Sequence, residues 1–236
     1  YVLPNAVTLA ALFAGFYAVV MAMNGRFEVA CIAVFCAAVL DSLDGRIARM
    51  THTQSAFGEQ MDSLCDMVGF GAAPALIVYE WALKGLGKPG LIAAFVYCAG
   101  AALRLARFNT NIDVVDKRYF QGMPSPAAAA LVAGFVWVMI DMGYTGEEVR
   151  WPASLLTVFA GITMVSNFPY WSGKDINLRK TVPFMFILAL VFGFVFVSAY
   201  PQGNLFLLFL VYAISGYALW AWRWFKRRKS RGLSPP

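Results

Sequence analysis

Four aspartates in two neighbouring apolar stretches are the residues whose type and spacing most clearly suggest chemistry. Asp41 and Asp44 are three residues apart and Asp62 and Asp66 are four apart, so on helices each pair lies on one face. Carboxylates this close repel one another unless a cation lies among them. Mg²⁺ and Mn²⁺ prefer carboxylate oxygens, and Mg²⁺ commonly completes its shell with substrate phosphates. The cluster therefore indicates a metal site that acts on phosphoryl groups.

The cost of placing these acids in apolar segments supports a functional interpretation. One Asp in a membrane helix costs about 2.5 to 3.5 kcal/mol, so four unpaired ones would cost on the order of 10 kcal/mol. The alternative is that Asp41 and Asp44 lie near a helix end and are merely solvated. The spacing of the two pairs and their neighbours argue against that alternative.

The composition predicts a membrane protein. Of the 236 residues, 60% are hydrophobic and 14% are charged, against about half apolar in soluble domains. The runs 181–200 and 205–222 approach the roughly 20 residues that cross a bilayer core. The four cysteines lie in apolar segments without CxxC spacing, so neither a zinc site nor a disulfide framework is indicated.

Hydropathy predicts an all-α, polytopic bundle of about eight transmembrane helices. The expected spans are 2–23, 29–49, 59–83, 90–107, 124–142, 151–167, 181–200 and 204–224. No repeats or soluble domain interrupt them. We therefore expect one membrane domain, 1–225, that contains the acidic segment 41–66 and is followed by a basic tail, 226–236.

The basic residues predict the orientation of this bundle. Fifteen Lys and Arg fall on the side that carries both termini and four on the other, so the positive-inside rule places both termini and the aspartates at the cytoplasm. A net charge of +6 could suggest nucleic-acid binding, but these residues are not gathered on a soluble domain. The tail, WAWRWFKRRKSR, instead suits a membrane surface with anionic lipids.

The residues around the aspartates extend the pattern. Gly45, Ala48 and Gly58 are small enough for a ligand to approach the backbone closely, although close helix packing is the competing explanation. Arg49 suits either a phosphate contact or a topological anchor. Together they form Asp41-x2-Asp44-Gly45-x2-Ala48-Arg49-x8-Gly58-x3-Asp62-x3-Asp66.

This pattern resembles the signature of the CDP-alcohol phosphotransferase family at all eight fixed positions. The resemblance implies that Asp41, Asp44 and Asp62 bind two divalent cations, Mg²⁺ or Mn²⁺. It also implies that Asp66 contributes to the metal site and serves as general base. Gly45, Ala48 and Gly58 would then line the CDP moiety, and two metals could stabilise both the attacking and the leaving oxygen.

Four further segments are similar to the phosphatidylserine synthases of bacterial membranes within that family. They are LPNAVTLAALFAGF from Leu3, RFNT from Arg107, QGMPSPAAA from Gln121 and SNFPYWSGK from Ser166. The resemblance implies an enzyme of the bacterial cytoplasmic membrane, usually a homodimer. It would transfer the phosphatidyl group of CDP-diacylglycerol to L-serine and release CMP.

Serine carries a carboxylate and an ammonium, so its pocket should offer a cation and neutral acceptors. Arg104, Arg107 and Asn109 at the end of span 90–107 could supply them, as could Ser125 between two prolines. For the arginines the alternative is topology or lipid binding, and for Ser125 it is a cap.

The start of the chain and one connecting loop add weaker candidates. Asn5 and Thr8 resemble the family's first-helix element near the nucleotide, with a plain N-cap as the alternative. His52, the single histidine, is expected to be solvated. The roles of Asn167 and Lys174 stay open at this stage, as do the physiological metal and the acyl-chain preference.

Two rival functions remain open. The same reaction could use glycerol 3-phosphate, inositol phosphate or a choline-type alcohol as acceptor, and the arginine pair permits either a phosphorylated or a free alcohol. Alternatively, the aspartates could bind an ion carried by a transporter or channel. Broken helices in two matched halves would favour transport, and the sequence contains no such pair.

Overall fold

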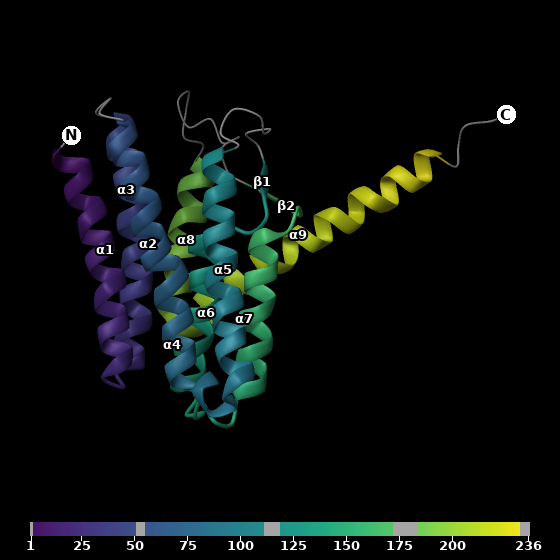
Figure 1. Ribbon diagram of the computed structural model, residues 1–236. Helices are drawn as coiled ribbons and strands as arrows, with labels where there is room; N and C mark the ends of the chain where they lie inside the picture. Colours follow the sequence, from purple (N-terminus) through teal and green to yellow (C-terminus); the bar gives the residue numbers. More distant parts are fainter. Residues whose placement is uncertain (1, 51–54, 111–118, 172–183, 232–236) are drawn as a thin grey trace.

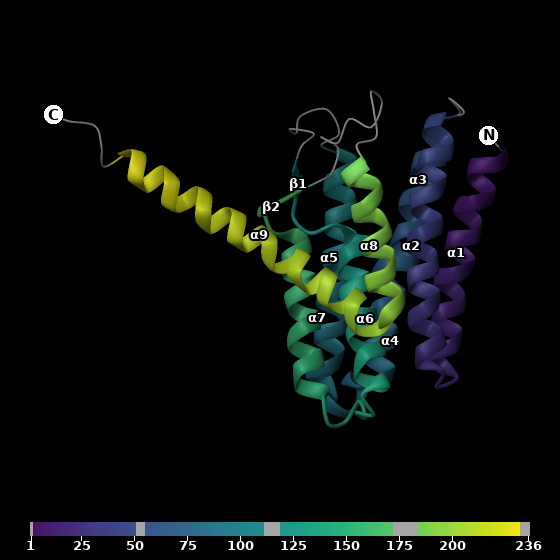
Figure 2. The same ribbon diagram turned by 180° about the vertical axis from the view of Figure 1, so that it is seen from behind.

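Helices standing side by side make up nearly all of the protein. The computed structural model describes residues 2–50, 55–110, 119–171 and 184–231. Within these residues the chain forms eight helical rods, and the last of them leaves the bundle at an oblique angle (Figures 1 and 2). The predicted all-helical class is therefore confirmed.

The helices agree closely with the predicted spans. Their bounds are α1 Val2–Met23, α2 Phe27–Met50, α3 Ala56–Asp66, α4 Ala73–Trp81, α5 Lys88–Thr110, α6 Ser125–Asp141, α7 Arg150–Val165, α8 Phe184–Ala199 and α9 Pro201–Arg231. A π-helical turn, η1 (Met67–Ala72), joins α3 to α4 in one rod, and a short 3₁₀ turn, η2 (Leu83–Leu86), precedes α5.

Four of the described helical segments are long and apolar enough to cross a membrane. They are Asn5–Met23, Phe57–Trp81, Lys88–Thr110 and Pro201–Trp222. The helices α6 and α7 are apolar but shorter. The protein is thus an integral membrane protein by the length and composition of its helices.

The core of the bundle lies around α6, whose small side chains let its neighbours approach. Most of α6 is buried, including the run Ala127–Ala133. A second close contact joins α5 and α7, where a Cβ on Gly100 would lie 2.5 Å from the Gly161 carbonyl oxygen. Small residues at helix contacts are the usual means of close packing in membranes.

A two-stranded antiparallel pairing was not among the predicted elements. Strand β1 (Tyr119–Gln121) pairs with β2 (Pro169–Trp171), with Phe120 opposite Tyr170. The pairing joins the loop before α6 to the segment after α7, at the end of the bundle where α2 ends and α3 begins (Figure 1). Tyr170 is fully buried, and its hydroxyl donates a 2.7 Å hydrogen bond to the Ala213 carbonyl of α9.

Candidate active site

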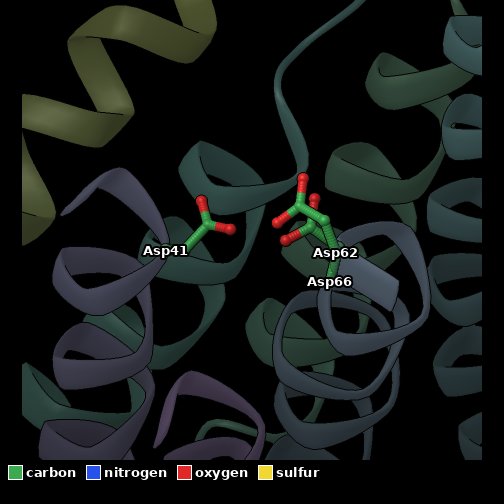
Figure 3. A group of neighbouring side chains, drawn as sticks. All are labelled: Asp41, Asp62 and Asp66. Carbon is green, nitrogen blue, oxygen red and sulfur yellow. The ribbon is translucent and has the colours of Figure 1, made fainter. Parts of the chain in front are cut away.

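The α2 and α3 helices bring the predicted acids together from two neighbouring rods. Asp41 lies just past the middle of α2, and Asp62 and Asp66 lie one turn apart on α3. Each of the three offers one carboxylate oxygen, and these oxygens lie within 4.8 Å of one another. Figure 3 shows Asp41 pointing from α2 toward the two acids of α3. We call these three residues the acidic cluster.

Asp44 lies beside the acidic cluster but is not one of its three members. It is 4% exposed, and it accepts hydrogen bonds from the Thr8 side chain and the Gly45 main chain. Its Oδ2 atom is buried and has no hydrogen-bond partner among the described residues. A buried carboxylate oxygen without a donor is costly unless a cation or ligand satisfies it.

These carboxylates suit a hard divalent cation. The Asp41 and Asp66 side chains approach within hydrogen-bonding distance of each other, and two ionised carboxylates so close repel unless positive charge or a proton lies between them. All of the oxygens are of the type that Mg²⁺ and Mn²⁺ prefer. The donor set and the unsatisfied Asp44 oxygen therefore fit a metal site.

The N-terminus of α3 lies against the start of α1. Ser55 caps the helix by accepting a 3.0 Å hydrogen bond from the Gly58 N–H. A Cβ on Gly58 would lie 3.2 Å from Ser55 Oγ and 3.6 Å from Asn5 Oδ1. The absence of a side chain at Gly58 thus leaves room beside Asn5, and a larger residue would crowd Ser55 Oγ.

Arg104 connects the acidic cluster to the start of α6. Its Nη1 donates a 2.6 Å hydrogen bond to Ser125 Oγ, and its charge acts on Asp66. Ser125 is fully buried, so this bond satisfies a hydroxyl that water does not reach. Two of the predicted acceptor residues, Arg104 and Ser125, therefore lie together next to the acids.

Arg107 is held quite differently. Its guanidinium donates to the main-chain carbonyls of Gln121, Val165 and Ser166 at 2.7, 2.9 and 3.2 Å. It also donates to Asn167 Oδ1 at 3.0 Å and, more weakly, to the Met164 carbonyl at 3.4 Å. The planar fork is thus occupied by the end of α7 and the β1 strand, an arrangement that favours a structural tie over substrate contact.

The chain as a whole is similar to known proteins. Residues 1–168 match the family model for CDP-alcohol phosphatidyltransferase. The chain belongs to the CDP-alcohol phosphatidyltransferase family. A Helicobacter pylori protein named CDP-diacylglycerol–serine O-phosphatidyltransferase is 37% identical over 220 residues, 91% of this chain and 90% of the relative.

Two archaeal relatives widen the comparison. A Methanocaldococcus jannaschii protein, also named CDP-diacylglycerol–serine O-phosphatidyltransferase, is 32% identical over 183 residues, which is 78% of this chain and 80% of the relative. A Methanothermobacter thermautotrophicus protein named archaetidylserine synthase is 30% identical over 170 residues, 71% of this chain and 69% of the relative. The names of these two relatives refer to different lipids, and both names include serine.

Asn109 contacts the helix that carries two of the acids. Its Nδ2 donates a 3.0 Å hydrogen bond to Ser63 Oγ, which joins the end of α5 to α3 beside Asp62. Sequence reasoning missed Ser63, although its place next to a signature Asp was a usable signal. It also missed Asn167 as a partner of Arg107, because that contact links positions 60 residues apart.

Some predicted residues fall outside what the structure describes. The side chains of Ala48 and Arg49 are not among the described ones, although their backbone continues α2. His52, Lys174 and the tail residues 232–236 also lie outside the described residues. Gly45 is described and exposed at the same end of α2.

Proposed function

We propose that this protein transfers the phosphatidyl group of CDP-diacylglycerol to the hydroxyl of L-serine, giving phosphatidylserine and CMP. The observation that carries the proposal is the acidic cluster, with three carboxylate oxygens within 4.8 Å of one another. It occurs in a chain that aligns over about nine tenths of its length with a relative named for this reaction.

For the donor, we propose that Asp41, Asp44, Asp62 and Asp66 hold two divalent cations, Mg²⁺ or Mn²⁺. When bound, these cations would neutralise the negative charge of the pyrophosphate and the charge that develops on the leaving CMP. Asn5, Thr8, Gly45, Ala48, Arg49 and Gly58 are proposed to surround the CDP moiety. Asn5 Oδ1, which lies 3.6 Å from where a Cβ on Gly58 would be, and the hydrogen bond of Thr8 to Asp44 support this assignment.

For the reaction, Asp66 is proposed to accept the proton of the serine hydroxyl. The serine oxygen then attacks the phosphorus that carries the diacylglycerol, and the bond from that phosphorus to the CMP phosphate oxygen breaks. The electron pair leaves with CMP, so atoms and charge balance. The position of Asp66, close to both Asp41 and Arg104, supports this role.

For the acceptor, Arg104 is proposed to bind the serine carboxylate, with Ser125 and Asn109 as neutral partners. A half-buried guanidinium next to the acids offers the charge that free serine needs. Arg107 was also a candidate for the acceptor pocket. We propose that it stabilises the loops next to this pocket and does not contact serine, because its N–H groups already donate to other residues.

We further propose that all eight rods span the bacterial cytoplasmic membrane with both termini in the cytoplasm. The distribution of Lys and Arg supports this orientation. The start of α1 and the end of α9 also lie toward the same end of the bundle as β1 and β2 (Figure 1). The one-domain organisation and the homodimer implied by the family resemblance belong to the same proposal.

The test is release of CMP by purified protein in lipid nanodiscs with CDP-diacylglycerol and Mg²⁺ or Mn²⁺. L-serine, glycerol 3-phosphate, inositol phosphate and choline are offered in turn. We expect CMP with serine alone, and no CMP when EDTA removes the metal. CMP with another acceptor and not with serine would reject the serine assignment. Folded protein that releases CMP with none of them would reject the enzyme.

A further inference from the structure

A π-helical turn begins directly after Asp66. In η1 the helix makes a wider turn, with the Ala73 N–H bonded to the Val68 carbonyl five residues earlier. Such a turn accommodates an extra residue and so changes the rotation of the following helix relative to the preceding one. It allows α3 to present its acids to α2 while α4 buries Ile77 and Val78 in the core.

Neighbouring helices enclose this turn closely. A Cβ on Gly15 of α1 would lie 2.8 Å from the Gly69 Cα, so the two backbones are in contact. On the other side, a Cβ on Gly71 would lie 3.2 Å from the Ala101 side chain of α5. The three residues Gly69, Phe70 and Gly71 are all buried. The turn is therefore packed from two sides and has little space to relax.

Tyr97 of α5 adds a directed bond to this packing. Its side chain is fully buried, and its hydroxyl donates a 2.9 Å hydrogen bond to the Phe70 carbonyl at the middle of the turn. A buried tyrosine hydroxyl needs a partner, and here the partner is the main chain of η1. This bond specifies where along α5 the turn sits.

We propose that Tyr97 is a positioning residue for the acidic cluster. By holding η1 in the π conformation, it sets the rotation of α3 and hence the approach of Asp62 and Asp66 to Asp41. Tyr97 acts through the backbone of the turn and touches none of the reacting atoms. The inference rests on the proposed function of the acids as metal ligands and adds the residue that orients them.

The chain contains a matched control for this role. Tyr170 is also fully buried, and its hydroxyl also donates to a helix carbonyl, that of Ala213. This second bond joins β2 to α9 rather than α5 to η1. Tyr97→Phe and Tyr170→Phe therefore remove the same kind of bond at two places, one in the turn that directly follows Asp66 and one between β2 and α9.

The experiment measures Mn²⁺ binding and turnover for the full-length wild type and both variants in nanodiscs. Binding is followed by the electron paramagnetic resonance signal of free Mn²⁺ without substrates. For Tyr97→Phe we expect a dissociation constant for Mn²⁺ raised about fivefold, since one buried hydrogen bond is lost. We expect kcat with serine to fall by a similar factor and the KM for CDP-diacylglycerol to rise, because the cations would neutralise its pyrophosphate. Tyr170→Phe should match the wild type in all three.

The outcomes separate this inference from the proposed function. Equal Mn²⁺ affinity and kcat in the two variants, with an active wild type, would overturn the positioning role alone. A wild type that neither binds Mn²⁺ nor releases CMP would overturn both.

Should Tyr97→Phe fail to fold, amide hydrogen exchange on the wild type decides the matter. Coupling between the sites is reciprocal, so Mn²⁺ should slow exchange in a peptide of α5 centred on Tyr97 more than in one covering Ala213. Equal slowing in the two peptides would overturn the inference.

Discussion

Replacing Arg107 by Ala distinguishes a structural tie from a substrate contact. The variant removes the fork that joins α5 to β1 and to the end of α7. Of its five acceptors, the carbonyls of Gln121 and Val165 and the Asn167 side chain are exposed, and water can replace the lost donors there. The carbonyls of Met164 and Ser166 are part-buried and would lose their donor with less access to water.

The expected loss of stability follows from these two carbonyls. A buried acceptor left without a donor costs about 1 kcal/mol or more, so Arg107→Ala should lower the free energy of unfolding by roughly 2 kcal/mol. For a chain of this size that corresponds to a fall in Tm of about 4 to 8 °C. The KM for serine should stay within about twofold in assays well below the new Tm, as expected when substrate binding is unaffected.

The assay is thermal unfolding of detergent-solubilised protein, followed by tryptophan fluorescence, together with serine titration of CMP release. Arg26→Ala serves as control, because Arg26 is exposed in the turn between α1 and α2. Arg107→Lys should recover part of the stability, since an ammonium keeps the charge but loses the planar fork. An unchanged Tm with a tenfold higher serine KM would refute the structural role and place Arg107 in the acceptor pocket.

Three other substitutions test the site and the bundle. Asp66→Asn keeps a ligand oxygen but cannot take a proton, so kcat should fall roughly 10²- to 10⁴-fold while Mn²⁺ still binds; normal turnover would remove Asp66 from the mechanism. Ser125→Ala deprives Arg104 of its partner, and the serine KM should rise about tenfold; an unchanged KM would exclude the pair from the pocket. Gly100→Val should lower Tm, because its Cβ meets the Gly161 carbonyl; an unchanged Tm would contradict that contact.

The helices were predictable because their signal is strong and local. Apolar runs bounded by polar or glycine-containing turns located all eight rods. The turn between α1 and α2 is an example, since Gly25 adopts a φ of +73° there. The acids were predictable for a related reason, because a charge in an apolar run is costly and its spacing decides which face it occupies.

The π turn and the strand pairing were not predictable in the same way. A π turn changes the helix by a single residue, and MVGFGA between Asp66 and Ala73 has the composition of any buried helix. Strands of three residues on either side of α6 and α7 carry no periodic pattern, and their pairing depends on the packing of those helices. The predicted third span, 59–83, was therefore correct as one continuous helical segment, but the sequence did not predict the π turn within it.

Side-chain partners explain the remaining differences at the site. Arg104 and Arg107 are one helical turn apart and had the same expected role, yet one meets Ser125 and the other meets main-chain carbonyls. Every residue has a main-chain carbonyl, so the sequence does not indicate which carbonyls accept hydrogen bonds from an arginine. The course of α9 is a similar case, because its hydropathy predicted a span ending near 224 while the helix continues to Arg231.

Attack of the serine hydroxyl on phosphorus is the central claim, and L-serine labelled with ¹⁸O in its hydroxyl group tests it most directly. The wild type in nanodiscs is given this serine, CDP-diacylglycerol and Mn²⁺, and the products are analysed by mass spectrometry. We predict phosphatidylserine that retains the ¹⁸O and CMP that carries none. Label in CMP, or phosphatidylserine without label, would contradict transfer to the serine oxygen.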